Sequence, residues 1–166
     1  MSHAEEKPVI LSIGDDGGMR QAAWHDPAFR EAGWQHWTVE EGLRSPAAER
    51  GPDEDVRIRV RSVRRGTAVE RALLQALRTG AGWVGAWFPA AGPAPSLQEL
   101  EQLGFAALQA DLALQSSPSG HCRLLALRDP IPLLFRELSW LQAPRSEELI
   151  ERCLEVEASA YSLPSA

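Results

Sequence analysis

Lysine is almost missing from this sequence of 166 residues, in which Lys7 is the only one. Because lysine and arginine together number 17, the other 16 basic side chains are arginines. A composition of this kind is typical of a GC-rich, bacterial-like genome that favours arginine codons. Whatever its origin, it almost excludes any mechanism that depends on a buried catalytic lysine.

Long apolar runs, a secretion signal and a cysteine framework are missing as well. No apolar stretch approaches the roughly 20 residues that a membrane helix needs, and the start of the chain lacks the basic and then apolar pattern of a secretion signal. Cys122 and Cys153 are the only cysteines, which favours a reducing compartment over a disulfide scaffold. We therefore predict a cytoplasmic protein with no membrane partner.

The charge balance and the histidines narrow the function classes further. The formal net charge is −6, which argues against specific nucleic-acid binding. The four histidines show no metal-ligand spacing with the two cysteines, so no metal site is predicted. Hydrophobic residues make up 44% and charged residues 24%, as in an ordinary globular protein of one domain with at most a short appendage.

Short strand and helix patterns follow one another along the chain, which predicts an α/β (mixed α+β) fold. We expect a flexible tail over 1–7, an α/β domain over 8–128, and a C-terminal helical appendage and tail over 129–166. The predicted strands cover 8–13, 34–39, 56–63, 83–88 and 122–127. The predicted helices cover 27–32, 67–77, 96–103, 129–143 and a last segment from residue 146. Residues 42–55 are expected to be a loop, and 105–127 to contain a hairpin, although 105–114 also fits a helix.

The segment from Ile58 to Leu77 is the best candidate for a binding site. It predicts a strand, a tight loop with one glycine, and a helix. Free N–H groups at the start of such a helix, together with the helix dipole, can hold a phosphate group. Arg64 and Arg65 would add positive charge to that pocket. An ordinary strand–loop–helix connection is the simpler alternative.

This segment resembles motif A of the GNAT superfamily of acyl-CoA-dependent N-acyltransferases, and the likeness extends over residues 56–128. The chain reads VRSVRRGTAVERALL from Val60, and SLQELEQLGF from Ser96 is similar to the helix of that family that ends in L-G-F. The resemblance implies a GNAT-like central mixed sheet flanked by helices, with acetyl-CoA as cofactor and an amine as acceptor. It places the coenzyme A pyrophosphate on Val60, Ser62, Arg64, Arg65, Gly66, Thr67, Ala68 and Val69.

Several positions depart from the pattern of that family. Glu70 stands where a small residue is usual, and Leu100 stands where many members have a tyrosine that protonates the leaving thiolate. A degenerate, non-catalytic relative that acts by protein binding is therefore the other form of this hypothesis. If the chain is catalytic, the base that takes the amine proton is expected among Glu40, Glu41 and His36.

A weaker resemblance concerns the N-terminal third, which is similar to a response-regulator receiver domain. Asp15 and Asp16 would be the acidic pair that binds Mg²⁺ in that family. The phosphorylated aspartate is replaced by Arg61 or Ser62, and the family's lysine has no counterpart. The resemblance thus implies a non-phosphorylatable pseudo-receiver, a signalling or protein-interaction module on a flavodoxin-like parallel sheet.

Sheet topology separates these hypotheses. The acyltransferase fold requires antiparallel strands and two neighbouring parallel strands that splay apart near Val60 and Trp87, whereas a receiver has five strands that are all parallel. The C-terminal helices carry narrow apolar stripes. They are expected to pack on their own sheet, with a protein partner or a second copy of the chain as the alternative.

Overall fold

The computed structural model describes residues 7–13, 22–41, 47–50, 56–60, 67–131, 134 and 143–164. Side-chain positions are described for all of these except 40–41, 47–50, 56–60 and 67–68. Among these residues, no helix is both long enough and apolar enough to cross a membrane.

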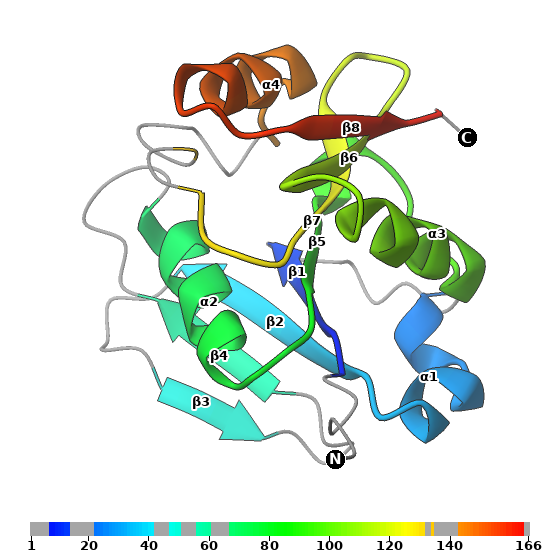
Figure 1. The fold of residues 1–166 in the computed structure, drawn as a ribbon. Coiled ribbons are helices and arrows are strands. Elements are labelled where there is room, and N and C mark those ends of the chain that lie inside the picture. The colour runs from blue at the N-terminus through cyan, green and yellow to red at the C-terminus, as the bar shows by residue number, and fades with distance from the viewer. Residues whose placement is uncertain are drawn as a thin grey trace, which may run out of the picture.

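The described strands form one mixed sheet with the spatial order β3-β4-β2-β1-β5-β7-β6-β8 (Figure 1). The four strands β4, β2, β1 and β5 are parallel to one another, whereas β7 runs antiparallel to both β5 and β6. The predicted α/β class is therefore confirmed. The strands are β1 Val9–Ile13, β2 Gln35–Glu41, β3 Ala47–Arg50, β4 Val56–Val60, β5 Val84–Trp87, β6 Leu112–Ser116, β7 Cys122–Leu127 and β8 Ala160–Leu163.

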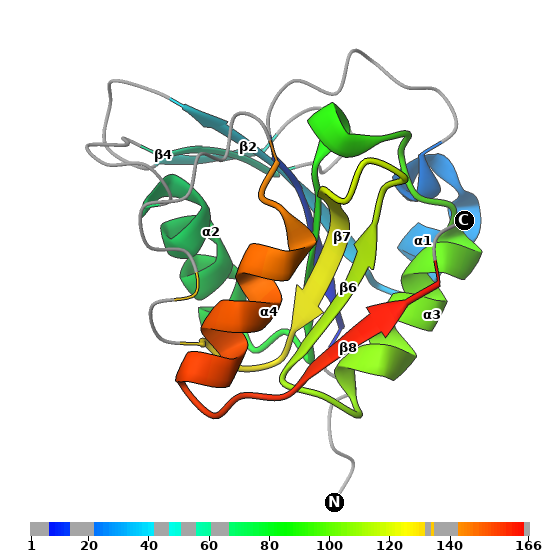
Figure 2. The same ribbon diagram turned by 90° about the horizontal axis from the view of Figure 1, so that it is seen from above.

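Helices cover both faces of the sheet (Figure 2). The 3-10 turn η1 (Ala23–His25), α1 (Pro27–Glu31) and α3 (Leu97–Ala107) lie on one face, and α2 (Thr67–Arg78) and α4 (Ser146–Glu155) lie on the other. The connections β1–α1–β2 and β4–α2–β5 run in opposite directions along the sheet. Because such crossovers are right-handed, their helices fall on opposite faces.

Burial on both faces explains why β1 lacks an alternating pattern. All five residues of VILSI are buried. Leu11 belongs to the apolar core beneath α2 and α4, and Ile10 belongs to the core beneath α1 and α3. A central parallel strand covered on both sides is expected to read as one continuous apolar run.

The sequence located the start of α3 but not its end. Ser96 caps the helix, because its hydroxyl accepts from the Glu99 amide while the Glu99 carboxylate accepts from the Ser96 amide. The predicted stop at Gly104 is wrong, since the helix continues to Ala107. Gly104 is needed instead for close packing, because an added Cβ would lie 2.9 Å from the Trp83 ring.

Two edge strands were not predicted. The 42–55 segment, expected as a loop, contains β3, and the expected C-terminal tail contains β8, which pairs with β6. The predicted 105–127 hairpin is confirmed as β6 and β7, preceded by the last turn of α3. Most of the helix predicted over 129–143, and the tail over 1–6, fall outside the described residues.

The topology contradicts both of the finer fold predictions. The acyltransferase arrangement needed β4 and β5 as neighbours near Val60 and Trp87, yet β2 and β1 lie between them. The flavodoxin-like alternative needed an all-parallel sheet, yet the antiparallel β7 lies between β5 and β6. The appendage is also more than helical, because it supplies β8 to the sheet.

Candidate functional site at the carboxyl edge of the sheet

The parallel strands β4, β2, β1 and β5 all end at one edge of the sheet, the upper edge in Figure 2. The chain runs from β1 to β2 on one side and returns to β5 on the other side of β1. This reversal makes the carboxyl ends of β1 and β5 a topological switch point. In open α/β sheets, ligands bind at such a point.

Several of the residues predicted from the sequence do lie along this edge. Glu40 and Glu41 end β2, and Glu41 is opposite Val60 at the end of β4. Thr67 and Ala68 begin α2 on the far side of the predicted loop, whereas the Val69 side chain is buried in the core and unavailable to a ligand. The rest of the predicted set lies outside the described residues: Asp15, Asp16, Ser62, Arg64, Arg65 and Gly66.

His36, the other candidate base, belongs to a buried polar contact between β1 and β2. Its Nε2 shares a hydrogen bond of 2.7 Å with the Ser12 hydroxyl. The Trp24 ring stacks on the imidazole with a centroid distance of 4.0 Å and packs against Trp87. A serine beside a histidine resembles a nucleophile with its base, but Ser12 is 0% exposed. This pair therefore joins two strands beneath η1 and does not face a substrate.

The residues Phe88–Pro95, which we call the edge segment, follow β5 at the switch point. They include the short 3-10 turn η2 (Pro89–Ala91). Phe88 and Ala91 pack with the core on the α2 side, whereas Ala94 packs with the core on the α3 side. The edge segment thus crosses the carboxyl edge of the sheet from one helical layer to the other, and none of its side chains is charged.

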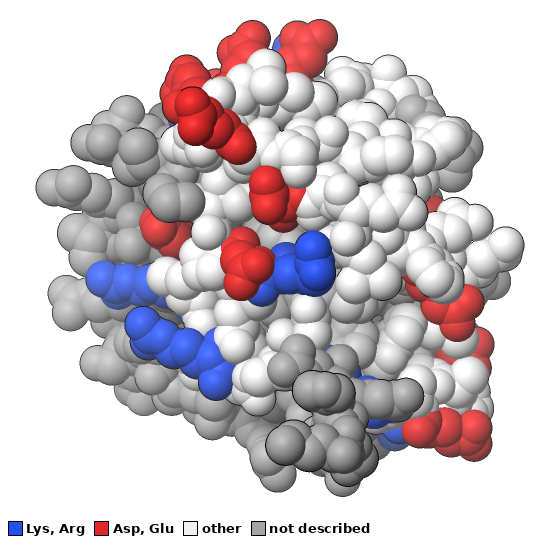
Figure 3. Space-filling view, in the orientation of Figure 1, with Lys and Arg blue, Asp and Glu red and all other residues white. Residues whose placement is uncertain are grey.

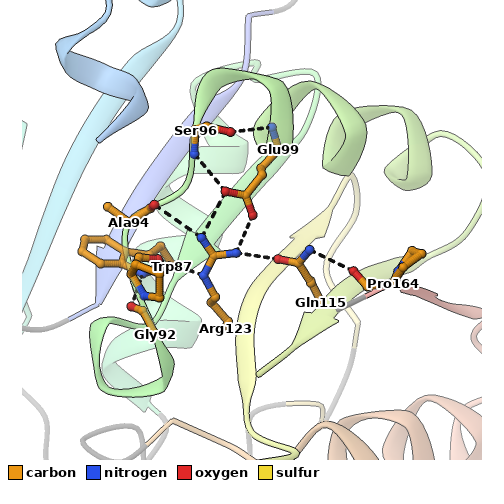
Figure 4. A network of polar contacts seen from close by, with 9 residues as sticks. Trp87, Gly92, Ala94, Ser96, Glu99, Gln115, Arg123 and Pro164 are labelled. Carbon is orange, nitrogen blue, oxygen red and sulfur yellow. Dashed lines mark hydrogen bonds and ion pairs between the residues drawn. The ribbon is translucent and has the colours of Figure 1, made fainter. Parts of the chain in front are cut away.

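Arg123, near the start of β7, holds the edge segment to its surroundings (Figure 4). The side chain is nearly buried and forms an ion pair with Glu99 of 2.6 Å. It donates hydrogen bonds to the carbonyls of Pro93 and Ala94, to both oxygens of Glu99 and to the side-chain oxygen of Gln115. Gln115 in turn donates to the carbonyl of residue 164, beyond the end of β8.

The electrostatics of this network favour an ionised Glu99. Burial raises the pKa of the Glu99 carboxyl. The hydrogen bond and charge of Arg123, together with the Ser96 amide, lower this pKa by a larger amount, so the net pKa lies below its usual value. A carboxyl whose pKa is depressed by folding stabilises the protein above its unfolded pKa. That contribution is lost as the pH falls through the folded pKa.

The Glu99→Gln variant tests this pH dependence. We expect the wild type to be more stable than the variant at pH 7, and the difference to shrink as the pH falls from about 5 to 3, the range in which glutamate protonates. Urea unfolding at a series of pH values measures it. Glu101→Gln, at an exposed position on the same helix, is the control. A difference that stays constant with pH would show that the ion pair does not depress this pKa.

Acidic side chains are concentrated at one end of the visible face of the molecule, whereas acidic and basic side chains adjoin near its centre (Figure 3). Acidic side chains gather over α4, where Glu147, Glu148, Glu151 and Glu155 are exposed, whereas α2 presents the exposed Arg71 and Arg78. Among the described side chains, no group of three or more His, Cys, Asp or Glu residues is placed to hold a metal ion.

The comparisons with known proteins agree with this topology and not with the sequence resemblances. No family model and no curated protein matches the chain. A solved structure from Desulfovibrio desulfuricans G20, named "putative nucleotide-diphospho-sugar transferase", is similar in fold. Its TM-score is 0.67 at 12% sequence identity, and the match covers 97% of this chain and 80% of that one. The likeness extends over nearly the whole chain, so it overturns the GNAT interpretation and its acetyl-CoA-dependent chemistry, and it leaves the pseudo-receiver alternative without support.

Proposed function

We propose that this chain binds a nucleoside diphosphate sugar at the carboxyl edge of its parallel strands, where β1 and β5 end side by side. The observation that carries the proposal is the topological switch at these strands, in a sheet whose fold matches a protein named for this substrate class. Fold likeness alone does not fix a function. The proposal therefore rests equally on how this edge is built.

The edge offers different chemistry to the two halves of such a ligand. The edge segment beside β5 is uncharged and, apart from the buried Phe88, consists of small residues and prolines, which suits a base or a sugar ring. Positive charge for the diphosphate is supplied by the sequence between Val60 and Thr67, which includes Arg64 and Arg65. Because β4 is three strands from β5, their ends are about 14 Å apart. An extended nucleoside diphosphate sugar can span that distance.

Thermal unfolding with a panel of ligands tests the proposal. UDP-glucose, GDP-mannose, TDP-glucose and ADP-glucose are added singly, with and without Mg²⁺, beside acetyl-CoA. A ligand at 100 times its Kd stabilises a protein by about 2.7 kcal/mol. In a chain of this size that corresponds to a rise in Tm of roughly 5–10 °C. We expect such a rise for at least one nucleoside diphosphate sugar and none for acetyl-CoA.

Matched arginine variants localise the site. Arg64→Ala together with Arg65→Ala should remove most of the shift, whereas Arg71→Ala together with Arg78→Ala, with the same change in charge on the exposed side of α2, should preserve it. The proposal fails if no nucleoside diphosphate sugar raises the Tm at millimolar concentration. It also fails if the two double variants lose binding equally, because binding would then follow net charge.

We also propose that the protein acts in the cytoplasm. Cys122 and Cys153 are both free and buried. Burial raises the pKa of the Cys122 thiol above its usual value, and burial with the nearby charge of Asp111 raises that of Cys153 to about 11. Buried thiols that stay protonated suit a reducing compartment and need no disulfide partner. Cell fractionation tests the location.

A further inference from the structure

The Arg123 guanidinium has no donor left for a ligand. An arginine side chain carries five N–H groups. The structure gives these groups five acceptor oxygens. The Nε group donates to the Pro93 carbonyl at 2.8 Å, and one terminal nitrogen donates to Glu99 and to Gln115, both at 2.6 Å. The other terminal nitrogen donates to Glu99 at 3.2 Å and to the Ala94 carbonyl at 3.3 Å. The side chain is also only 7% exposed. Arg123 is therefore excluded as a direct phosphate contact, although it lies at the edge where the ligand is proposed to bind.

The groups that Arg123 holds belong to the edge segment. Two of its bonds reach the carbonyls of Pro93 and Ala94, and its aliphatic part lies against Gly92, where an added Cβ would be 3.0 Å from Cδ. Trp87 secures the same turn from the other side, because its indole N–H donates to the Gly92 carbonyl at 3.2 Å. The turn from Gly92 to Ala94 is thus fixed between a buried arginine and a buried tryptophan (Figure 4).

The remaining bonds anchor Arg123 to rigid elements. Glu99 lies in the first turn of α3, and Gln115 lies near the end of β6. Phe88 also donates its amide to the Arg123 carbonyl at 2.9 Å. Helix α3 and strand β6 therefore hold the Arg123 side chain, the end of β5 holds its backbone, and the side chain in turn holds the edge segment.

We infer that Arg123 is a positioning residue, which holds the turn Gly92–Ala94 as a preformed wall of the nucleotide-sugar site. This inference rests on the proposed function. Because the edge segment is uncharged, the wall faces the base or the sugar and not the diphosphate. A segment that is ordered before binding costs less entropy when the ligand arrives, so its loss should weaken binding without removing any contact to the ligand.

Arg123→Lys tests the inference, because lysine keeps the charge but has three donors on a single nitrogen and cannot reproduce the fork. Leu149→Ala is the control, since it destabilises the buried side of α4 on the opposite face of the sheet. Two quantities are measured well below the Tm of every variant. They are the hydrogen exchange of the Ala91 and Gly92 amides, which bond within the edge segment, and the Kd values for UDP-glucose and GDP-mannose, each titrated separately.

We expect Arg123→Lys to speed exchange of both amides by about tenfold or more and to raise the Kd about tenfold, whereas Leu149→Ala changes neither. Trp87→Phe, which removes the indole donor to Gly92, should speed the same exchange. Unchanged exchange in Arg123→Lys, or equal acceleration in Leu149→Ala, overturns the positioning role.

The binding arm separates this inference from the proposed function. If the wild type binds neither nucleotide sugar and the wider panel also fails, the proposed function and the wall are both overturned, whatever the exchange shows. If the wild type binds, and Arg123→Lys binds equally well despite faster exchange, the wall is overturned while the proposed function stands.

Discussion

Arg123→Met is expected to lower the free energy of unfolding by about 2–4 kcal/mol, because it breaks a largely buried ion pair from one side. The variant leaves the Glu99 carboxylate without its cation, and it leaves the Pro93 carbonyl and the Gln115 side-chain oxygen without donors. Groups buried without a partner cost more than the bonds themselves contribute. The Glu99 side chain is 24% exposed in the folded protein. Water therefore screens part of the unpaired charge, and the expected loss lies toward the lower end of this range. Urea unfolding at pH 7 measures it.

Two further variants show whether this loss comes from the network. Arg128→Met removes an exposed arginine with one long hydrogen bond of 3.4 Å to the Leu108 carbonyl, and should cost less than about 0.5 kcal/mol. Arg123→Met combined with Glu99→Met replaces both charges by apolar side chains, and should recover part of the loss. Equal losses in Arg123→Met and Arg128→Met would show that the buried pair contributes nothing special to stability.

Local patterns predicted the elements of this fold better than their arrangement. The apolar run at β1, the alternation at β4 and the helical spacing of α2 all identified real elements. The motif-like stretch from Val60 therefore contains the strand end and the helix that the GNAT resemblance required. That resemblance predicted the wrong neighbour for β4, which pairs with β2 and not with β5. The choice of neighbour is decided by pairing between segments far apart in the chain.

The two missed strands lie at the edges of the sheet. β3 reads AAER and β8 reads AYSL, each only four residues long and without the apolar alternation that marks a half-buried strand. Edge strands are often short and polar, because such sequences resist pairing with other chains. Their extended form depends on the neighbouring strand, which supplies hydrogen bonds that local propensity does not report.

The candidate site shows the same division between local and distant information. The Ser96–Glu99 capping box is a local pattern and could have been identified from the sequence. Arg123 carried a weaker signal, as the one charged residue in the apolar run CRLLAL. Its partners lie between 8 and 30 residues away, so no spacing in the sequence could have identified the network.

Gly104→Ala should lower the free energy of unfolding by up to about 2 kcal/mol, although alanine is the better helix former. Inside a helix this change ordinarily stabilises by about 1 kcal/mol. Here the new methyl group would meet Trp83 ring atoms at 2.9–3.0 Å, and overpacking of this kind costs about 1–3 kcal/mol. The ring cannot easily move away, because Trp34 packs edge-on against it and Gly85 lies under its other end.

A double-mutant cycle with Trp83→Leu separates the two opposing effects. In the Trp83→Leu background the steric conflict is gone, so Gly104→Ala should become neutral or stabilising by up to about 1 kcal/mol. The coupling between the two positions should therefore equal the cost of the steric conflict, about 1–3 kcal/mol, within the range that contacting residues show. Urea midpoints of the four proteins measure it. Additive effects would mean that the glycine is not required by the tryptophan.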